Sequence, residues 1–163
     1  MHKTKLIIAA CIFALYSSTA SANWQYTKWC MSQEQVKAAA PGTVIALTPR
    51  EQIVDSVADS HNIALLKTPY SSGGYQFDAI FSFDKSKTSL ASVKLKLVNL
   101  DRAAQLFDSL CTKYGQPTKE KKSESLSYAF WYTAEDQIVY ISIGDKMVSV
   151  NYLPRNTEDN NGL

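Results

Sequence analysis

The sequence predicts an α+β fold in which short helices pack on antiparallel β-sheet, because the hydrophobic period changes twice along the chain. Residues 75–97 alternate between apolar and polar, which indicates an antiparallel hairpin with one buried face. Residues 99–115 follow the helical period, and residues 126–152 return to alternation. The predicted order is helices, strands, a helix and strands again. It suggests two α-then-β halves, which would form one sheet or two abutting sheets.

Two short helices are expected before the first long strands. Ser32 and Gln35 have the spacing of a capping box, so a helix begins at Ser32 and ends at the Pro-Gly pair of residues 41–42. Residues 48–51 repeat the capping pattern with a proline at the first helical position. Residues 53–58 supply apolar side chains at helical spacing, so a second short helix follows.

The remaining segments complete a single expected domain at residues 23–154. Residues 23–29 suggest an edge strand or an anchored arm, and the lysine-rich residues 119–122 suggest a solvated loop. The tail of residues 155–163 has no apolar period, so we expect it to be mobile. Further strands are predicted at residues 63–67, 126–132, 139–143 and 148–152.

Residues 1–22 have the features of a secretory signal peptide. Two lysines precede the uncharged residues 6–16, and the small residues 20–22 predict cleavage before Asn23. Eleven apolar residues are about half of the roughly 20 needed to span a bilayer. We therefore expect a periplasmic or secreted protein without a membrane span. Residues 8–11 also resemble a bacterial lipobox, which would make Cys11 a lipidated N-terminus.

The charge balance argues against a nucleic-acid partner. Removing Lys3 and Lys5 with the signal peptide takes the basic residues from 17 to 15, which equals the 15 acidic residues. Nucleic-acid binding depends on clustered lysine and arginine that neutralise phosphates. The expected partner is an envelope protein of unidentified nature and not a nucleic acid.

Two cysteines remain after the expected cleavage, Cys30 and Cys111. In an oxidising compartment they are expected to form a disulfide. In the chain-entropy model, closing so long a loop would stabilise the fold by about 4.5 kcal/mol. The bond would hold the first helix and the helix of residues 99–115 on the same side of the sheet. Two buried free thiols are the alternative.

The usual catalytic groups are scarce. The mature chain has one histidine, His61, and the Ser-x-x-Lys sequence of residues 82–85 lies at a strand end and not on a helix. We expect no catalytic residue, cofactor or metal. Two carboxylate pairs remain, Asp55 with Asp59 and Glu135 with Asp136. The spacing of the first would suit general acid/base chemistry only inside an apolar cleft.

Two features suggest binding to a partner. The loop of residues 70–75 combines tyrosine, serine and glycine, a mixture that provides rigid aromatic area beside adaptable hydrogen bonding. Trp131 points to the face opposite Phe130 and Tyr132, so either another layer covers it or it lies on a contact surface. The candidate partner-binding residues are Tyr70, Ser71, Ser72, Gly73, Gly74, Tyr75 and Trp131.

The segments Trp29-Cys30-Met31-Ser32 to Val36 and Lys113-Tyr114-Gly115-Gln116-Pro117 resemble a group of small exported proteins of Gram-negative bacteria. Their pattern is W-G-M-S-x-x-x-V near the mature N-terminus and K-Y-G-x-P after the second helix. Cys30 stands where these proteins usually have glycine. The order of elements more remotely resembles the β-lactamase-inhibitor-protein fold. The resemblance implies a fold and an exported location, and it indicates little about the function.

Together these features favour a small periplasmic protein-binding module without catalytic activity, which presents a sheet face and a hairpin loop to its partner. One alternative is an immunity or inhibitor protein that blocks a toxin or an envelope hydrolase. Another is a hydrolase that uses the carboxylates of Asp55 and Asp59.

Overall fold

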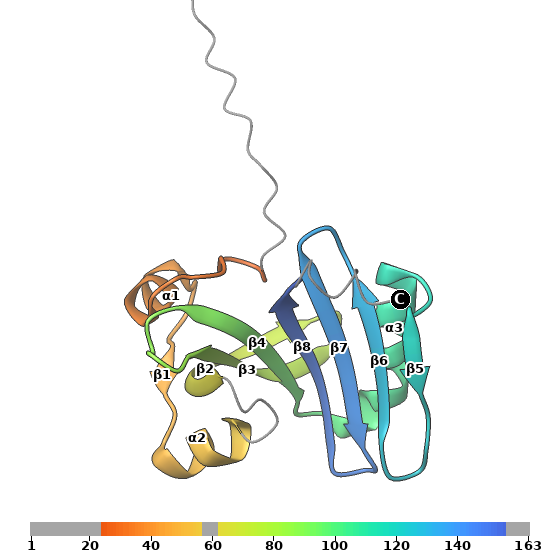
Figure 1. Cartoon of the computed structure of the whole chain (residues 1–163). Coiled ribbons are helices and arrows are strands. Elements are labelled where there is room, and N and C mark those ends of the chain that lie inside the picture. Colours follow the sequence, from red (N-terminus) through yellow and green to blue (C-terminus); the bar gives the residue numbers. More distant parts are fainter. Residues whose placement is uncertain (1–23, 57–61, 156–163) are drawn as a thin grey trace, which may run out of the picture.

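Eight antiparallel strands form one sheet in the part of the chain that the computed structural model describes, residues 24–56 and 62–155 (Figure 1). Their order is β1-β2-β3-β4-β8-β7-β6-β5, with three short helices, which confirms the predicted α+β class. Predictions for the signal peptide, Cys11, residues 57–61 and residues 156–163 lie outside the described residues. The strands are β1 (Ile45–Ala46), β2 (Asn62–Ser72), β3 (Tyr75–Asp84), β4 (Leu90–Leu97), β5 (Lys119–Lys121), β6 (Ser127–Tyr132), β7 (Asp136–Ile143) and β8 (Met147–Pro154).

The two α-then-β halves join through their last strands. β4 pairs with β8, and the register places Val93 opposite Tyr152 and Leu95 opposite Val150. The pairing makes one continuous sheet, so the alternative of two abutting sheets is wrong. In Figure 1, β2–β4 run across the view while β5–β8 run from top to bottom. The sheet therefore twists strongly where the halves meet.

The capping box predicted for the first helix is present in α1 (Gln33–Ala39). Ser32 Oγ accepts a hydrogen bond from the Gln35 amide at 3.3 Å, and Gln35 Oε1 accepts one from the Ser32 amide at 2.8 Å. The helix ends after seven residues with Ala40 in extended geometry, and Val36 is its buried residue.

α3 (Ala103–Tyr114) is the amphipathic helix that the period of residues 99–115 predicts. Its apolar stripe, Leu106 and Leu110, packs into the same core as Val36 of α1. Gly115 ends the helix with a φ of +83°, a left-handed value that glycine adopts without strain. In Figure 1, α3 lies behind β5–β8 and α1 lies beside β1–β4. The two helices therefore cover different halves of one sheet face.

α2 (Pro49–Ser56) packs on the opposite face of β2–β4. The predicted cap is formed, since the Thr48 amide donates to Glu51 Oε2 at 2.8 Å and the Glu51 amide donates to Thr48 Oγ1 at 3.4 Å. The apolar residues that predict this helix do not form a buried stripe, because Ile53 and Val54 are 68% and 59% exposed. Another kind of contact must hold α2 on the sheet.

Charged pairs supply that contact. Glu51 pairs with Lys67 of β2, and this hydrogen bond, with those from Thr48, lowers the pKa of Glu51 to about 2. Asp55 Oδ1 lies 3.7 Å from Lys94 Nζ and 4.0 Å from Lys96 Nζ, both on β4. The carboxylate of Asp55 is therefore occupied by two lysines, and its expected partner Asp59 lies outside the described residues.

Strand pairing decides the structure of two segments, the lysine-rich residues 119–121 and the N-terminal residues 24–29. Residues 119–121 are not a solvated loop, because Lys119, Glu120 and Lys121 pair with β6 as an edge strand. Residues 24–29 form turns and no strand, so the anchored arm is the correct alternative. Trp24 anchors this arm by packing its buried indole against the rings of Tyr70 and Phe81.

The predicted disulfide is not formed, because Cys30 and Cys111 are both free thiols. Cys30 is exposed, and its amide donates to the Leu90 carbonyl at 3.0 Å, which fixes it beside the start of β4. Cys111 belongs to α3, which covers the other half of the sheet. The expectation placed the helices on one face correctly, but it missed their separation along that face.

We expect Cys30→Gly to raise the free energy of unfolding by roughly 0.5 kcal/mol. Cys30 has a φ of +68°, where a side chain costs about 1–2 kcal/mol, and the extra freedom of glycine in the unfolded chain offsets part of the gain. Urea unfolding measures the change. Cys30→Ser keeps the side chain and should leave stability unchanged, whereas a bonded Cys30 would make both variants several kcal/mol less stable.

Gly74→Ala should lower the free energy of unfolding by about 1–2 kcal/mol. Gly74 has a φ of +81°, and an added Cβ would lie 3.1 Å from Arg102 Nη1. Gly42→Ala is the matched control, since no atom lies within 4 Å of its added Cβ and its φ is not positive. Equal unfolding midpoints for the two variants would contradict this account of the turn.

Candidate functional site

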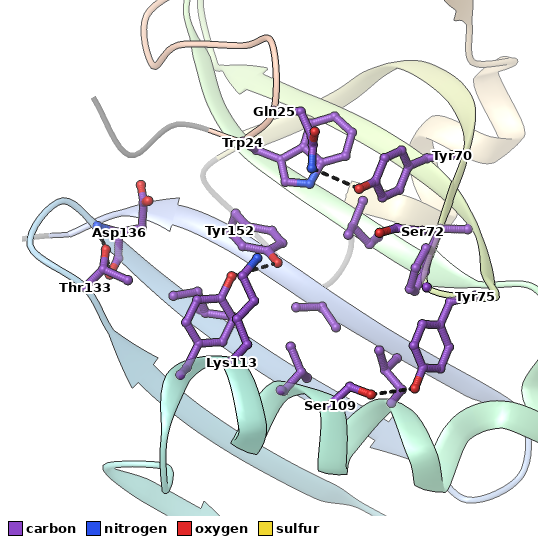
Figure 2. Close-up of a pocket in the computed structure, with 18 residues that line it drawn as sticks. Trp24, Gln25, Tyr70, Ser72, Tyr75, Ser109, Lys113, Thr133, Asp136 and Tyr152 are labelled. Carbon is purple, nitrogen blue, oxygen red and sulfur yellow. Dashed lines mark hydrogen bonds between the residues drawn. The ribbon is translucent and has the colours of Figure 1, made fainter. Parts of the chain in front are cut away.

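A groove of about 510 Å³ lies between α3 and the hairpin that joins β2 to β3 (Figure 2). Its floor is apolar and comes from Phe77, Leu95, Ile138 and Val150, on four different strands. Leu95 and Val150 are directly opposite each other in the β4–β8 pairing. The groove therefore lies over the junction of the two halves.

The hairpin predicted as a binding loop forms one wall of the groove. Tyr70, Ser72, Gly73 and Tyr75 line it, whereas Ser71 and Gly74 belong to the hairpin without lining it. Gly73 and Gly74 both have positive φ, as a tight two-residue hairpin turn requires.

Contacts at both ends hold this wall in place. Tyr75 Oη lies 2.7 Å from Ser109 Oγ of α3, and the guanidinium of Arg102 lies 5.2 Å from the Tyr75 ring centre. At the other end, Gln25 Nε2 donates to Tyr70 Oη at 2.9 Å. The hairpin is thereby tied to the helix and to the N-terminal arm.

A tyrosine pair closes the helix side. Tyr114 Oη of α3 lies 3.3 Å from Tyr152 Oη of β8, and burial raises the pKa of Tyr152 well above its ordinary value. Lys113 Nζ lies 4.9 Å from the Tyr114 ring centre and remains exposed to solvent. Figure 2 shows Lys113 beside Tyr152 within the groove. The Tyr152 phenol is therefore a neutral hydrogen-bonding group at physiological pH.

Asp136 borders the groove beyond Tyr152 (Figure 2) and is 7% exposed. Its Oδ1 accepts a hydrogen bond from Trp29 Nε1 at 2.9 Å, and its backbone amide donates to Thr133 Oγ1 at 2.9 Å. Burial raises the pKa of Asp136, the Trp29 hydrogen bond opposes that shift, and the nearby charge of Glu135 adds to it. The groove thus has a buried carboxyl group at one end.

Trp131 does not belong to the site. It is 2% exposed beneath α3, its Nε1 donates to the Gly115 carbonyl at 2.9 Å, and its ring lies 5.9 Å from that of Phe107. The alternative in which another layer covers Trp131 is therefore correct. As a consequence Phe130 and Tyr132 face outward, where no described helix covers them.

Sequence reasoning missed the other walls of the groove. Trp24, Tyr114, Tyr152 and Asp136 come from the arm, α3, β8 and β7, so only the fold brings them together. The sequence indicates Asp136 only as one member of a carboxylate pair with Glu135. No local spacing could have marked these residues as neighbours, because each lies on a different element.

Among residues 24–56 and 62–155, no three His, Cys, Asp or Glu side chains are grouped so that they could hold a metal ion. No helix in these ranges is long and apolar enough to cross a membrane. His61 lies outside them. The arrangement that the groove does offer is aromatic surface, hydroxyl groups and one buried carboxyl, which suits binding.

Asp136→Asn should make the protein more stable relative to wild type as the pH rises from 3 to 7. The pKa of Asp136 is higher in the folded than in the unfolded protein, so ionisation disfavours the folded state. That penalty is absent below the unfolded-state pKa of about 3.9 and complete above the folded-state pKa. Asparagine keeps an acceptor for Trp29 and carries no charge.

Urea unfolding at several pH values measures this difference between variant and wild type. Asp145→Asn, which removes an exposed carboxylate from the β7–β8 turn, controls for the change in net charge. A difference for Asp136→Asn that stays constant, or shrinks, with rising pH would contradict the buried-charge assignment.

Comparisons with known proteins do not indicate which ligand the groove binds. Comparison of the chain with known protein families, with curated proteins and with solved structures finds no match. What the groove binds must therefore follow from the chemistry of its own residues.

Proposed function

We propose that this chain is an exported, non-catalytic binding protein whose groove between α3 and the β2–β3 hairpin holds an apolar or aromatic group of a partner. One observation carries the proposal: six aromatic residues gather around a groove of about 510 Å³ over an apolar floor. Ligand sites typically have volumes of about 300–1,000 Å³ and this kind of lining. The six residues are Trp24, Tyr70, Tyr75, Phe77, Tyr114 and Tyr152.

The walls suit recognition of a group that is apolar with a few polar atoms. Tyrosine and tryptophan offer large rigid area at low cost in conformational entropy, with a hydrogen-bonding tip. Tyr70 and Tyr75 are held by Gln25 and Ser109, so little further ordering is needed when a ligand enters. Preorganisation of this kind favours affinity without any chemical step.

The location rests on residues 1–22 and their resemblance to a signal peptide. It makes an envelope protein, or a molecule of that compartment, the natural partner. The immunity or inhibitor alternative would use the same groove and differs in the identity of the partner. The hydrolase alternative has less support, because Asp55 pairs with Lys94 and Lys96 on the sheet face away from the groove.

Ser109→Trp should abolish partner capture by filling the groove from the helix wall. Ser109 is exposed and lines the groove, and its replacement also removes the hydrogen bond that holds the hydroxyl of Tyr75. The measurement is quantitative mass spectrometry of proteins and small molecules retained by the immobilised protein from an envelope extract. We expect any stoichiometric partner of the wild type to fall at least tenfold.

The matched control is Gln105→Trp, at an exposed position one helical turn earlier on α3 that does not line the groove. It adds the same indole to the same helix and should retain the partner. Equal retention by both variants would place the contact elsewhere on the surface. Turnover of an envelope substrate by the wild type would contradict the non-catalytic assignment.

A further inference from the structure

We propose that the groove selects an organic cation, a ligand whose aromatic or aliphatic body ends in an ammonium or guanidinium group held by Asp136. This inference rests on the proposed function, because it names the chemistry of the group that the groove binds. The nitrogen could belong to a free amine or to a lysine or arginine side chain of a partner. The recognising chemistry is the same in both cases.

The first argument is that Asp136 is buried but only half satisfied. Its Oδ1 accepts from Trp29 Nε1, and no residue in the described ranges donates to Oδ2 or forms an ion pair with this carboxylate. No buried side-chain oxygen there lacks a partner altogether, so Oδ2 must retain contact with open space. Asp136 borders the groove, and a ligand there can supply the missing donor.

The second argument is the aromatic surface beside this carboxylate. A cation over the face of tryptophan or tyrosine is attracted by the ring quadrupole, more strongly when water is excluded. Tyr152 stands between Asp136 and the rest of the groove, and Trp24 forms part of the upper wall in Figure 2. An ammonium group at this end would contact a carboxylate and aromatic rings together, while its apolar body lies over the floor.

Lys113 is the one lysine lining the groove in the described residues, and its charge opposes a cationic ligand. Its side chain is exposed and its ammonium lies against the Tyr114 ring. Water screens an exposed charge far more than a buried one. The buried carboxylate of Asp136 therefore has the larger effect on which ligand charge the groove prefers.

The test compares three ligands that share a phenylethyl body: 2-phenylethylammonium, 2-phenylethanol and 3-phenylpropanoate. Each is titrated at millimolar concentration into the purified exported protein, and binding is followed by the indole N–H resonances of its tryptophans in NMR. We expect the ammonium to bind about tenfold or more tightly than the alcohol, and the carboxylate to bind most weakly. The Trp29 indole resonance should shift with the ammonium, because that N–H donates to Asp136.

Two variants assign the preference to one residue. Asp136→Asn should reduce ammonium binding to the level of the alcohol. A Trp131 indole resonance at its wild-type position will show that the variant is folded, because that N–H donates to the Gly115 carbonyl. Lys113→Gln removes the opposing charge, so it should strengthen ammonium binding and weaken carboxylate binding. A preference for the carboxylate, lost in Lys113→Gln, would overturn the inference. So would an ammonium preference that survives Asp136→Asn.

The outcomes separate this inference from the function on which it rests. Equal binding of all three ligands would support the groove as a binding site and refute its selection of a cation. Binding of none would contradict both. A capped peptide containing phenylalanine and arginine distinguishes the source of the nitrogen: tighter binding than 2-phenylethylammonium assigns a protein side chain, and weaker binding assigns a free amine.

Discussion

The pairing of β4 with β8 is the interaction on which the rest of this structure depends. It joins two four-stranded halves into one sheet, and opposite residues of this pair, Leu95 and Val150, form part of the groove floor. Because the sheet twists strongly where they meet, α3 covers one half of the inner face and α1 covers the other. The groove lies over the junction, where the N-terminal arm and the β2–β3 hairpin face α3.

Local sequence patterns predicted the elements well because each depends on a few neighbouring residues. The capping boxes that begin at Ser32 and Thr48 and the stripe of α3 are present, and β4 alternates from Val93 to Leu97. β3 alternates only in its first half, because residues 79–83 are buried on both faces of the sheet. The alternation did not predict the buried face of a strand where both faces carry apolar residues. In β6, Trp131 is buried while Phe130 faces outward, so alternation alone could not say which set lies inside.

The disulfide prediction failed for a related reason. Compartment and cysteine number indicate that two thiols would be oxidised if they met, but only the fold decides whether they meet. Cys30 lies in the N-terminal arm beside the start of β4, and Cys111 lies on α3 over the other half of the sheet. The left-handed φ of Cys30 is one that glycine adopts without strain.

Asp136 connects stability with function in this fold. A carboxyl group that is buried, with one oxygen bonded to Trp29 and no lysine or arginine paired to it in the described residues, costs stability whenever it ionises. An apolar or amide side chain at the same place would avoid that cost. The cost is compensated only when a ligand brings a positive nitrogen to the free oxygen. The same burial that raises the pKa of Asp136 also strengthens the attraction between its carboxylate and a cation, so the unfavourable charge is what makes this end of the groove selective in the proposed function.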